Sequence, residues 1–301
     1  MTAPTAAVVA STDGVEVALH ELAGDPTGQR PLVFVAHATG FHARAYLPLA
    51  AALAERFHVV GADFRGHGDT AAPAGPVDWR GYGDDADAVA GYLSARPGGE
   101  GGLIGFGHSK GGAALLMAAD RHPERFRLLV VFEPIVFPPA ETGAERPESP
   151  LVAGARRRRA TFPSVEAAIE NYAAKPPMAA FDPAALDAYV RYGFRPDHDG
   201  ITLKCAPEHE AQTFETGGNH ATWARLPDIG VPTLVVAGRV DEDQPSSRAL
   251  PIAAALPRGR SLELPELDHF GPFTHPGLIA EVISTAVDEM IPEVGDTPVV
   301  P

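Results

Sequence analysis

Short, mostly apolar runs alternate with helical patterns along most of this 301-residue chain. Such runs are typical of strands that are buried on both faces, because a half-buried strand alternates apolar with polar residues. They occupy residues 31–36, 57–64, 103–106, 128–132 and 232–237. Helical patterns follow them at residues 46–54, 79–93, 112–119, 246–256 and 278–290. This alternation predicts an α/β fold, with a mostly parallel central sheet covered by helices on both faces.

The alternation breaks between residues 134 and 223, where short helical stretches rich in alanine and proline replace the buried strands. An Asp199-Gly200 turn in this part is typical of a small hairpin. We therefore expect a first part of an α/β core at residues 1–133, a helical lid or cap at 134–223, and the second part of the core at 224–301. The lid would be an insertion into one core.

The acidic composition of the chain limits its partners. Lysine and arginine number 24 against 39 aspartates and glutamates, and a formal net charge of −15 opposes non-specific binding to nucleic acid or to an anionic membrane. The single cysteine, Cys205, is consistent with a reducing compartment. No apolar stretch approaches the roughly 20 residues of a membrane span, and the N-terminal residues lack the pattern of a secretory signal. We expect a cytoplasmic protein without nucleic-acid or membrane partners.

Ser109 stands between two glycines at the point where a predicted strand meets a helix of small residues. A turn this sharp strains the serine backbone and lifts its hydroxyl clear of the sheet. Gly107 and Gly111 have no Cβ, so the strand and the helix can pass close together. Lys110 opens the helix, where a backbone N–H has no partner within the helix and the dipole favours negative charge. These five residues predict a nucleophile and one donor to an oxyanion.

Candidate partners for the serine follow other predicted strands, at the edge of a parallel sheet where functional groups gather. His269 follows one such strand. Asp241 and Asp243 follow another, and Glu133 directly follows a third. A serine nucleophile needs an imidazole to take its proton and a carboxylate to orient that imidazole. We expect His269 as the base and Asp241 as the acid, with Glu133 and Asp243 as alternatives.

Five motifs resemble those of the α/β-hydrolase superfamily, and they come in the same order along the chain. They occupy residues 37–40, 63–70, 107–111, 238–245 and 267–271. The resemblance covers nearly all of the chain except the predicted lid, and it implies the α/β-hydrolase fold. It also implies a catalytic triad of Ser109, Asp241 and His269, with the backbone N–H groups of Thr39 and Lys110 as the oxyanion hole.

The resemblance implies a serine hydrolase that cleaves a small carboxylic ester, lactone or thioester through an acyl-enzyme intermediate, with no cofactor. Carbon–carbon bond hydrolysis, a cofactor-free haloperoxidase-like activity and a slow-turnover small-ligand receptor are the alternatives. The lid would set the choice of this small-molecule substrate. Its Tyr172, Phe181 and Tyr189 either line an apolar substrate pocket or form the lid's own core. Histidines and carboxylates with metal-ligand spacing are not evident, so we predict no metal.

The sequence alone does not decide the roles of two basic features. The ammonium of Lys110 either favours an anionic substrate or turns to solvent or to a carboxylate. Four arginines fill residues 156–159, and we expect them on a solvated helix, where they point in different directions. The alternative is that one of these arginines reaches the pocket and binds a carboxylate or phosphate through two hydrogen bonds.

Overall fold

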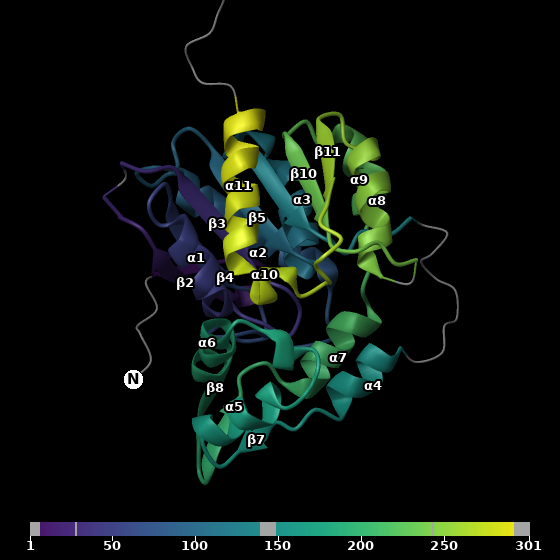
Figure 1. The fold of residues 1–301 in the computed structure, drawn as a ribbon. Helices are drawn as coiled ribbons and strands as arrows, with labels where there is room; N and C mark the ends of the chain where they lie inside the picture. The colour runs from purple at the N-terminus through teal and green to yellow at the C-terminus, as the bar shows by residue number, and fades with distance from the viewer. Residues whose placement is uncertain (1–6, 28, 139–148, 243, 292–301) are drawn as a thin grey trace, which may run out of the picture.

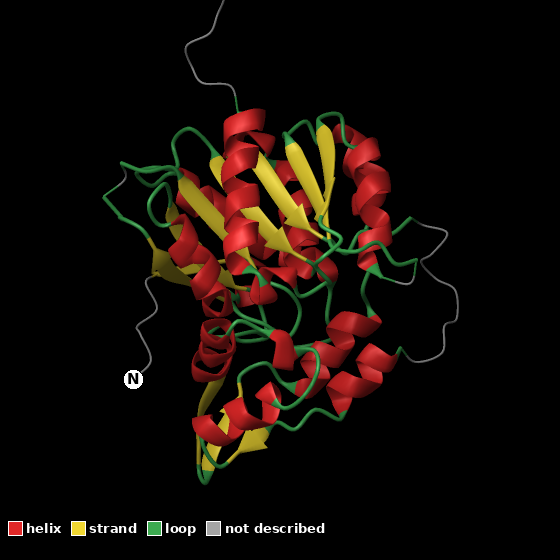
Figure 2. Ribbon diagram, viewed as in Figure 1, coloured by secondary structure: helices red, strands yellow, loops and turns green. Residues whose placement is uncertain are grey.

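The computed structural model describes residues 7–27, 29–138, 149–242 and 244–291. Its centre is an eight-stranded sheet in the order β1-β2-β4-β3-β5-β6-β10-β11 (Figure 1, Figure 2). The strands are β1 (Ala7–Ala10), β2 (Glu16–Ala23), β3 (Leu32–Ala36), β4 (His58–Asp63), β5 (Leu103–His108), β6 (Phe126–Phe132), β10 (Thr233–Ala237) and β11 (Gly259–Glu263). The β1–β2 and β2–β4 pairs are antiparallel, and the five other pairs are parallel. The prediction of a mostly parallel sheet is confirmed.

Helices cover both faces of this sheet (Figure 1). One face carries α1 (Leu47–Leu53) and α11 (Pro276–Met290), and the other carries α2 (Trp79–Ser94), α3 (Lys110–Arg121) and α9 (Ala249–Ala255). Successive residues of a strand point to opposite faces. In β3, Val33 and Val35 pack towards α1 and α11, whereas Leu32 and Phe34 pack towards α2 and α3. Both sets are fully buried, which is why the strands read as continuous apolar runs.

Between β6 and β10 the chain forms a separate layer beyond the carboxyl edge of the sheet (Figure 1). We call residues 150–215 the α4–α7 segment. It contains α4 (Pro150–Arg156), β7 (Thr161–Phe162), α5 (Val165–Ala173), α6 (Pro183–Gly193), β8 (Phe194–Asp197), β9 (Gly200–Leu203) and α7 (Pro207–Glu215), and the short helix α8 (Thr222–Arg225) follows it. The expected hairpin is present as β8–β9, and β7 extends it to a three-stranded antiparallel sheet. Two residues of β7 are too short a run to be recognised from sequence.

Three helices of the α4–α7 segment begin at polar caps that the sequence supplies. The side chains of Ser149, Ser164 and Asp182 accept hydrogen bonds from backbone N–H groups in the first turns of α4, α5 and α6. Proline follows two of these caps at the first helical position, where its missing N–H costs no hydrogen bond. Local signals of this kind fix where the helices start. Within the part of the chain that is described, no helix combines the length and apolar character of a transmembrane span.

Candidate active site

Ser109 occupies the turn between β5 and α3 in a strained conformation, with φ 56° and ψ −115°. Positive φ disfavours a residue with a side chain, so the surrounding structure must hold it. Two hydrogen bonds do so. The Ser109 N–H donates to the carbonyl oxygen of Phe132 at 2.9 Å, and the Ser109 carbonyl accepts from the N–H of Ile135 at 3.2 Å. The end of β6 therefore fixes the predicted nucleophile.

Both glycines of the serine turn are required by close approach of backbone. A Cβ on Gly111 would lie 2.1 Å from the carbonyl oxygen of Ala36 at the end of β3. A Cβ on Gly107 would lie 2.6 Å from the Cα of Gly112 in α3. No side chain fits at these distances, so the spacing of the two glycines reflects the geometry of the turn.

His269 lies against Glu133. Its Nδ1 is 2.6 Å from Oε2 of this carboxylate, while Oε1 accepts the backbone N–H of Gly238 at 2.8 Å. Glu133 is 1% exposed and adopts a φ of 45°, directly after the last residue of β6. Because a carboxylate can only accept, Nδ1 of His269 carries the hydrogen. Nε2 is then unprotonated, which is the tautomer that can take a proton from a nucleophile.

The prediction that Asp241 orients His269 disagrees with this geometry. Asp241 follows β10 as expected, but it is exposed, and its backbone N–H donates to Oγ of Ser246 at 3.1 Å. The physical reason is that β6 and β10 are neighbours in the sheet, so both carboxyl ends lead to the same region. Sequence order alone does not decide which acid reaches the imidazole. Asp243, the other alternative, lies outside the described residues.

Three hydrogen bonds join His269 to the loop after β3. Nε2–H of His108 donates to the carbonyl oxygen of His269 at 2.8 Å, and Nδ1 of His108 accepts from the hydroxyl of Tyr46 at 2.8 Å. The Tyr46 oxygen in turn accepts the N–H of Ala38 at 3.1 Å. Burial lowers the pKa of His108 well below its usual value, which favours this neutral tautomer. Sequence reasoning missed Tyr46, because nothing in its predicted helix marks it as a partner.

The predicted oxyanion donors lie in the loop after β3 and at the start of α3, which pack against each other at Ala36 and Gly111. Thr39 is buried in the loop after β3, and His37 holds this loop: its Nδ1–H donates to the carbonyl of Ala38, and its Nε2 accepts the N–H of Phe64. Lys110 is the first residue of α3, so its N–H has no carbonyl one turn earlier in the helix. The arrangement leaves this N–H available to a ligand.

The Lys110 side chain is 0% exposed. Its Nζ lies 4.3 Å from the ring centre of Tyr82, 5.0 Å from that of Phe64 and 3.5 Å from Nδ1 of His67. Burial lowers the pKa of Lys110 to about 7. Of the alternatives for this ammonium, the turn to solvent does not occur. No carboxylate among the described residues lies within 4 Å of Nζ.

The three predicted substrate-binding aromatics divide into two groups. Phe181 packs against Phe41, which follows the loop after β3, and against Phe270, which follows His269, with ring centres 6.1 and 5.7 Å apart. Tyr189 also contacts Phe41, at 5.2 Å. Tyr172 contacts Tyr189 at 5.6 Å and otherwise packs against rings of the α4–α7 segment itself. Phe181 thus lies against the neighbour of His269, and Tyr172 belongs to the core of its own segment.

The arginines at residues 156–159 do not all face solvent. Arg156 pairs with glutamates on the exposed side of α7, as a solvated helix would require. Arg158 turns inward: Nη1 lies 2.8 and 2.7 Å from the two oxygens of Glu210, and Nη2 donates to the hydroxyl of Tyr189. A Cβ on Gly40 would lie 2.3 Å from Oε1 of Glu210. The ion pair of half-buried Arg158 with buried Glu210 therefore rests on the loop after β3.

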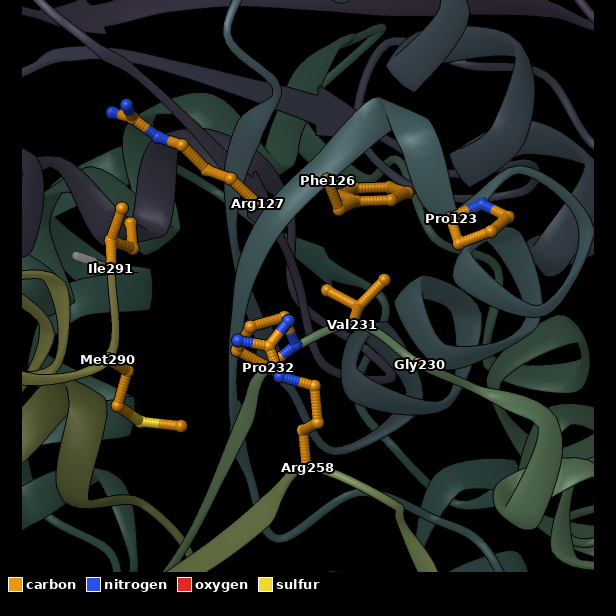
Figure 3. Close-up of a pocket in the computed structure, with 9 residues that line it drawn as sticks. All are labelled: Pro123, Phe126, Arg127, Gly230, Val231, Pro232, Arg258, Met290 and Ile291. Atoms are coloured by element: carbon orange, nitrogen blue, oxygen red, sulfur yellow. The ribbon is translucent and has the colours of Figure 1, made fainter. Parts of the chain in front are cut away.

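Two other features do not form part of this site. His20, Asp63 and Asp69 hold ligand atoms within 4.8 Å of one another, but Arg44 and Lys204 already contact Asp69, which leaves little charge for a metal ion. The pocket in Figure 3 is lined mainly by residues at or before the amino ends of β6, β10 and β11. It opens at the opposite edge of the sheet from the serine turn.

Comparison with known proteins identifies the family of the chain. The family model described as serine aminopeptidase, S33, matches residues 27–258. A relative, 2-(acetamidomethylene)succinate hydrolase of Mesorhizobium japonicum, is 26% identical over 269 residues, which are 87% of this chain and 89% of the relative.

Solved structures share the fold. E-2-(acetamidomethylene)succinate hydrolase has a TM-score of 0.74 at 21% identity and covers 93% of this chain and 98% of its own. The enol-lactonase from Burkholderia xenovorans has a TM-score of 0.68 at 20% identity, covering 94% of this chain and 100% of its own. Together with the family match, the serine turn and the parallel sheet, these likenesses lead to one conclusion: the protein is a hydrolase that belongs to the serine aminopeptidase S33 family of the α/β-hydrolase superfamily.

Proposed function

We propose that the protein hydrolyses a small carboxylic ester, lactone or thioester through an acyl-enzyme intermediate on Ser109. One observation carries the proposal: the strained serine turn stands next to a histidine whose Nδ1 is held at 2.6 Å by a buried carboxylate. His108, the residue before the serine, donates to the carbonyl of His269, so the imidazole is tied to the turn itself. A serine paired with an oriented imidazole is the arrangement that acyl transfer needs.

In the first half of the reaction, Oγ of Ser109 attacks the carbonyl carbon and its proton passes to Nε2 of His269. Glu133 stabilises the imidazolium that forms, because both of its oxygens stay in hydrogen bonds. The N–H groups of Thr39 and Lys110 would stabilise the oxyanion, a contribution of about 3 kcal/mol for each donor in well-studied enzymes. His269 then gives its proton to the leaving alkoxide or thiolate, and the acyl group stays on the serine.

In the second half, a water molecule attacks the acyl-enzyme carbonyl and gives one proton to Nε2 of His269. Collapse of the second tetrahedral intermediate breaks the bond to Oγ of Ser109, which takes the proton back from His269. The products are a carboxylic acid and the free enzyme.

The α4–α7 segment would act as the lid of this site. Its Phe181 and Tyr189 lie on Phe41 beside the loop after β3, and its Glu210 rests on Gly40. Segments in such a position usually gate a pocket and exclude water rather than carry out bond chemistry. We therefore assign the lid to substrate choice and none of the proton transfers.

A second candidate is hydrolysis of a small amide on the same residues. The likeness to 2-(acetamidomethylene)succinate hydrolase over 87% of this chain favours it, because that name contains an acetamido group. The steps are the same, except that His269 must deliver its proton to a leaving nitrogen. Comparison of kcat/KM for a 4-nitrophenyl acetate and the matching 4-nitroacetanilide separates the two candidates.

A fluorophosphonate probe, which reacts with activated serines, tests the common part of both candidates. The native protein should be labelled, and Ser109→Ala should abolish labelling and turnover while the circular dichroism spectrum stays native. Ser261→Ala, at an exposed position of β11, serves as the matched control and should be labelled like the native protein. Labelling that survives in Ser109→Ala would overturn the assignment of the nucleophile.

A further inference from the structure

The ammonium of Lys110 is buried beside the proposed nucleophile and lacks an adequate acceptor. An ion in the interior is costly unless it is paired and hydrogen-bonded. Among the described residues, the single hydrogen-bond partner of Nζ is Nδ1 of His67, at the long distance of 3.5 Å. The rings of Tyr82 and Phe64 attract the cation through their faces, but they cannot replace three hydrogen-bond acceptors.

His67 cannot satisfy both of its own neighbours. Its Nδ1 also lies 3.0 Å from the carbonyl oxygen of Arg65, which can only accept. If Nδ1 carries the hydrogen, it donates to Arg65 and offers no lone pair to Lys110. If Nδ1 is bare, the hydrogen sits on Nε2, which is buried and has no partner. Either way, one donor in this pair is left without an acceptor.

Nearby carboxylates are already occupied. Asp63 accepts from Nε2 of His20 and from the backbone N–H groups of Ala43 and Asp69. Asp85 accepts from the guanidinium of Arg65. These two acids influence Lys110 only at longer range. Across the loop after β3, the half-buried cation of Arg158 is by contrast matched by both oxygens of Glu210.

We infer that Lys110 binds a carboxylate of the substrate and makes the enzyme selective for small acyl compounds that carry a negative charge. A carboxylate there would accept from Nζ of Lys110 and from Nε2–H of His67, and so supply the missing acceptor to both. The inference rests on the proposed function, because it places the anion next to Ser109.

The lid helix α7 stands over this position. A Cβ on Gly66, the neighbour of His67, would lie 2.0 Å from Nε2 of His209 in α7. Ser109 and Lys110 are both buried, so the inference requires the surrounding packing to open before a ligand reaches them. Charged and titratable groups face Lys110 from every packed element, and they are His37, Asp63, His67, Tyr82, Asp85, Cys205 and His209.

A pair of chromogenic esters measures the selectivity directly. We compare kcat/KM for the 4-nitrophenyl monoester of succinic acid with that for 4-nitrophenyl pentanoate, a neutral acyl chain of similar length. Lys110→Met should lower the ratio of charged to neutral by about 10- to 100-fold, the range expected for hydrogen bonds to a charged group. Lys110→Arg should retain part of the preference for the charged ester. Lys175→Met, at an exposed lysine of the α4–α7 segment, is the matched control and should keep the native ratio.

The pH dependence of the ratio adds a second readout. Burial lowers the pKa of Lys110 to about 7, so the ammonium is fully present below neutral pH. The substrate carboxylate is fully ionised over this pH range. The ratio of kcat/KM for the charged ester to that for the neutral ester should therefore fall in the native protein as the pH rises above 7. Lys110→Met should show no such fall. A ratio that Lys110→Met leaves unchanged would overturn the inference.

A binding experiment keeps the inference separate from the proposed catalysis. Titration calorimetry with glutarate requires no turnover, so it remains informative even if Ser109 is not labelled by the fluorophosphonate probe. Glutarate should bind to the native protein and to Lys175→Met, and at least about tenfold more weakly to Lys110→Met. Equal binding to all three proteins, or binding to none of them, would contradict the role of Lys110.

Discussion

Two buried charged residues, Glu133 and Lys110, neighbour Ser109 in the fold, and the protein holds them differently. Glu133 has one oxygen on Nδ1 of His269 and the other on the N–H of Gly238, at 2.6 and 2.8 Å. Lys110 has two aromatic faces and one long contact of 3.5 Å to a histidine nitrogen. The carboxylate of Glu133 has its hydrogen-bond partners without any ligand, whereas the ammonium of Lys110 does not.

In the proposed mechanism, this difference separates a group that orients the base, Glu133, from a group that recognises the substrate, Lys110. A base must be oriented before the substrate arrives, since reorganisation during the reaction would add to the barrier. A recognition group must instead keep hydrogen-bonding capacity for the ligand, and in the free protein that capacity is a cost. Buried polar groups that lack hydrogen-bond partners are expected mainly at functional sites, and the ammonium of Lys110 is such a group.

Glu133→Gln should cause the largest effect. If the amide oxygen keeps the bond to Gly238, the NH₂ group faces Nδ1 of His269 and forces the hydrogen onto Nε2. This is the wrong tautomer for a base, and such a change lowers kcat by about 10⁴-fold in the best-studied triad. Steady-state kinetics with 4-nitrophenyl acetate measures the loss.

Asp241→Asn is the matched comparison for that variant. Because Asp241 is exposed and His269 is bonded to Glu133, we expect kcat/KM to change by less than about tenfold. The reverse pattern, in which Asp241→Asn is inactive and Glu133→Gln is active, would assign the catalytic acid to the loop after β10 and contradict the role of Glu133.

Lys110→Met should stabilise the folded protein, by a few kcal/mol at neutral pH. Between pH 7 and its usual value of 10.5, the unfolded chain keeps a proton on Lys110 that the folded protein has lost. Where the unfolded state binds more protons, the free energy of unfolding rises with pH. The native protein therefore carries the full penalty of burying the ammonium below pH 7, and loses that penalty towards pH 10.5.

Urea unfolding at pH 6, 8 and 10 tests this expectation. The stability advantage of Lys110→Met over the native protein should be largest at pH 6 and should shrink as the pH rises. Lys175→Met should match the native protein at all three values. A Lys110→Met variant that is less stable than the native protein at pH 6 would mean that the ammonium is well satisfied in the free protein.

The sheet could be predicted from the sequence because each buried strand is marked by its own run of consecutive apolar residues. Residues in the strands of a parallel sheet face helices on both sides, so runs such as residues 31–36 are apolar throughout. The serine turn could also be recognised from sequence, because Ser109 and its two glycines lie within five consecutive residues. The contact that requires Gly107 is local, with Gly112, whereas the one that requires Gly111 is with Ala36 in β3.

The rest of the site depends on distances between residues far apart in the chain. Glu133 and Asp241 both follow strands, and only the register between β6 and β10 and the path of each loop decide which one meets His269. Tyr46 joins the loop after β3 to His108 across 62 positions of sequence. The burial of Lys110 depends on Tyr82, His67 and the position of α7. No local pattern encodes these contacts.

The smallest expected effect concerns the aromatic groups, and it sharpens the contrast between chemistry and recognition. Phe181 lies against Phe41 and Phe270, beside His269 and away from the rings that surround Lys110. Phe181→Ala should change the preference among acetate, butyrate and hexanoate esters by about 1–3 kcal/mol, because extra methylenes gain or lose an apolar contact. Activity on the acetate ester should survive, since no proton transfer involves this ring.

Tyr172→Ala separates packing from recognition within the same segment. Tyr172 contacts rings of the α4–α7 segment itself, so its removal should lower thermal stability and leave the chain-length preference nearly native. Neither variant should move the ratio of charged to neutral esters, which we attribute to Lys110 alone. If Phe181→Ala changed the charge ratio as strongly as the length preference, the two sides of Ser109 would not act independently, and the division between an apolar and a charged subsite would fail.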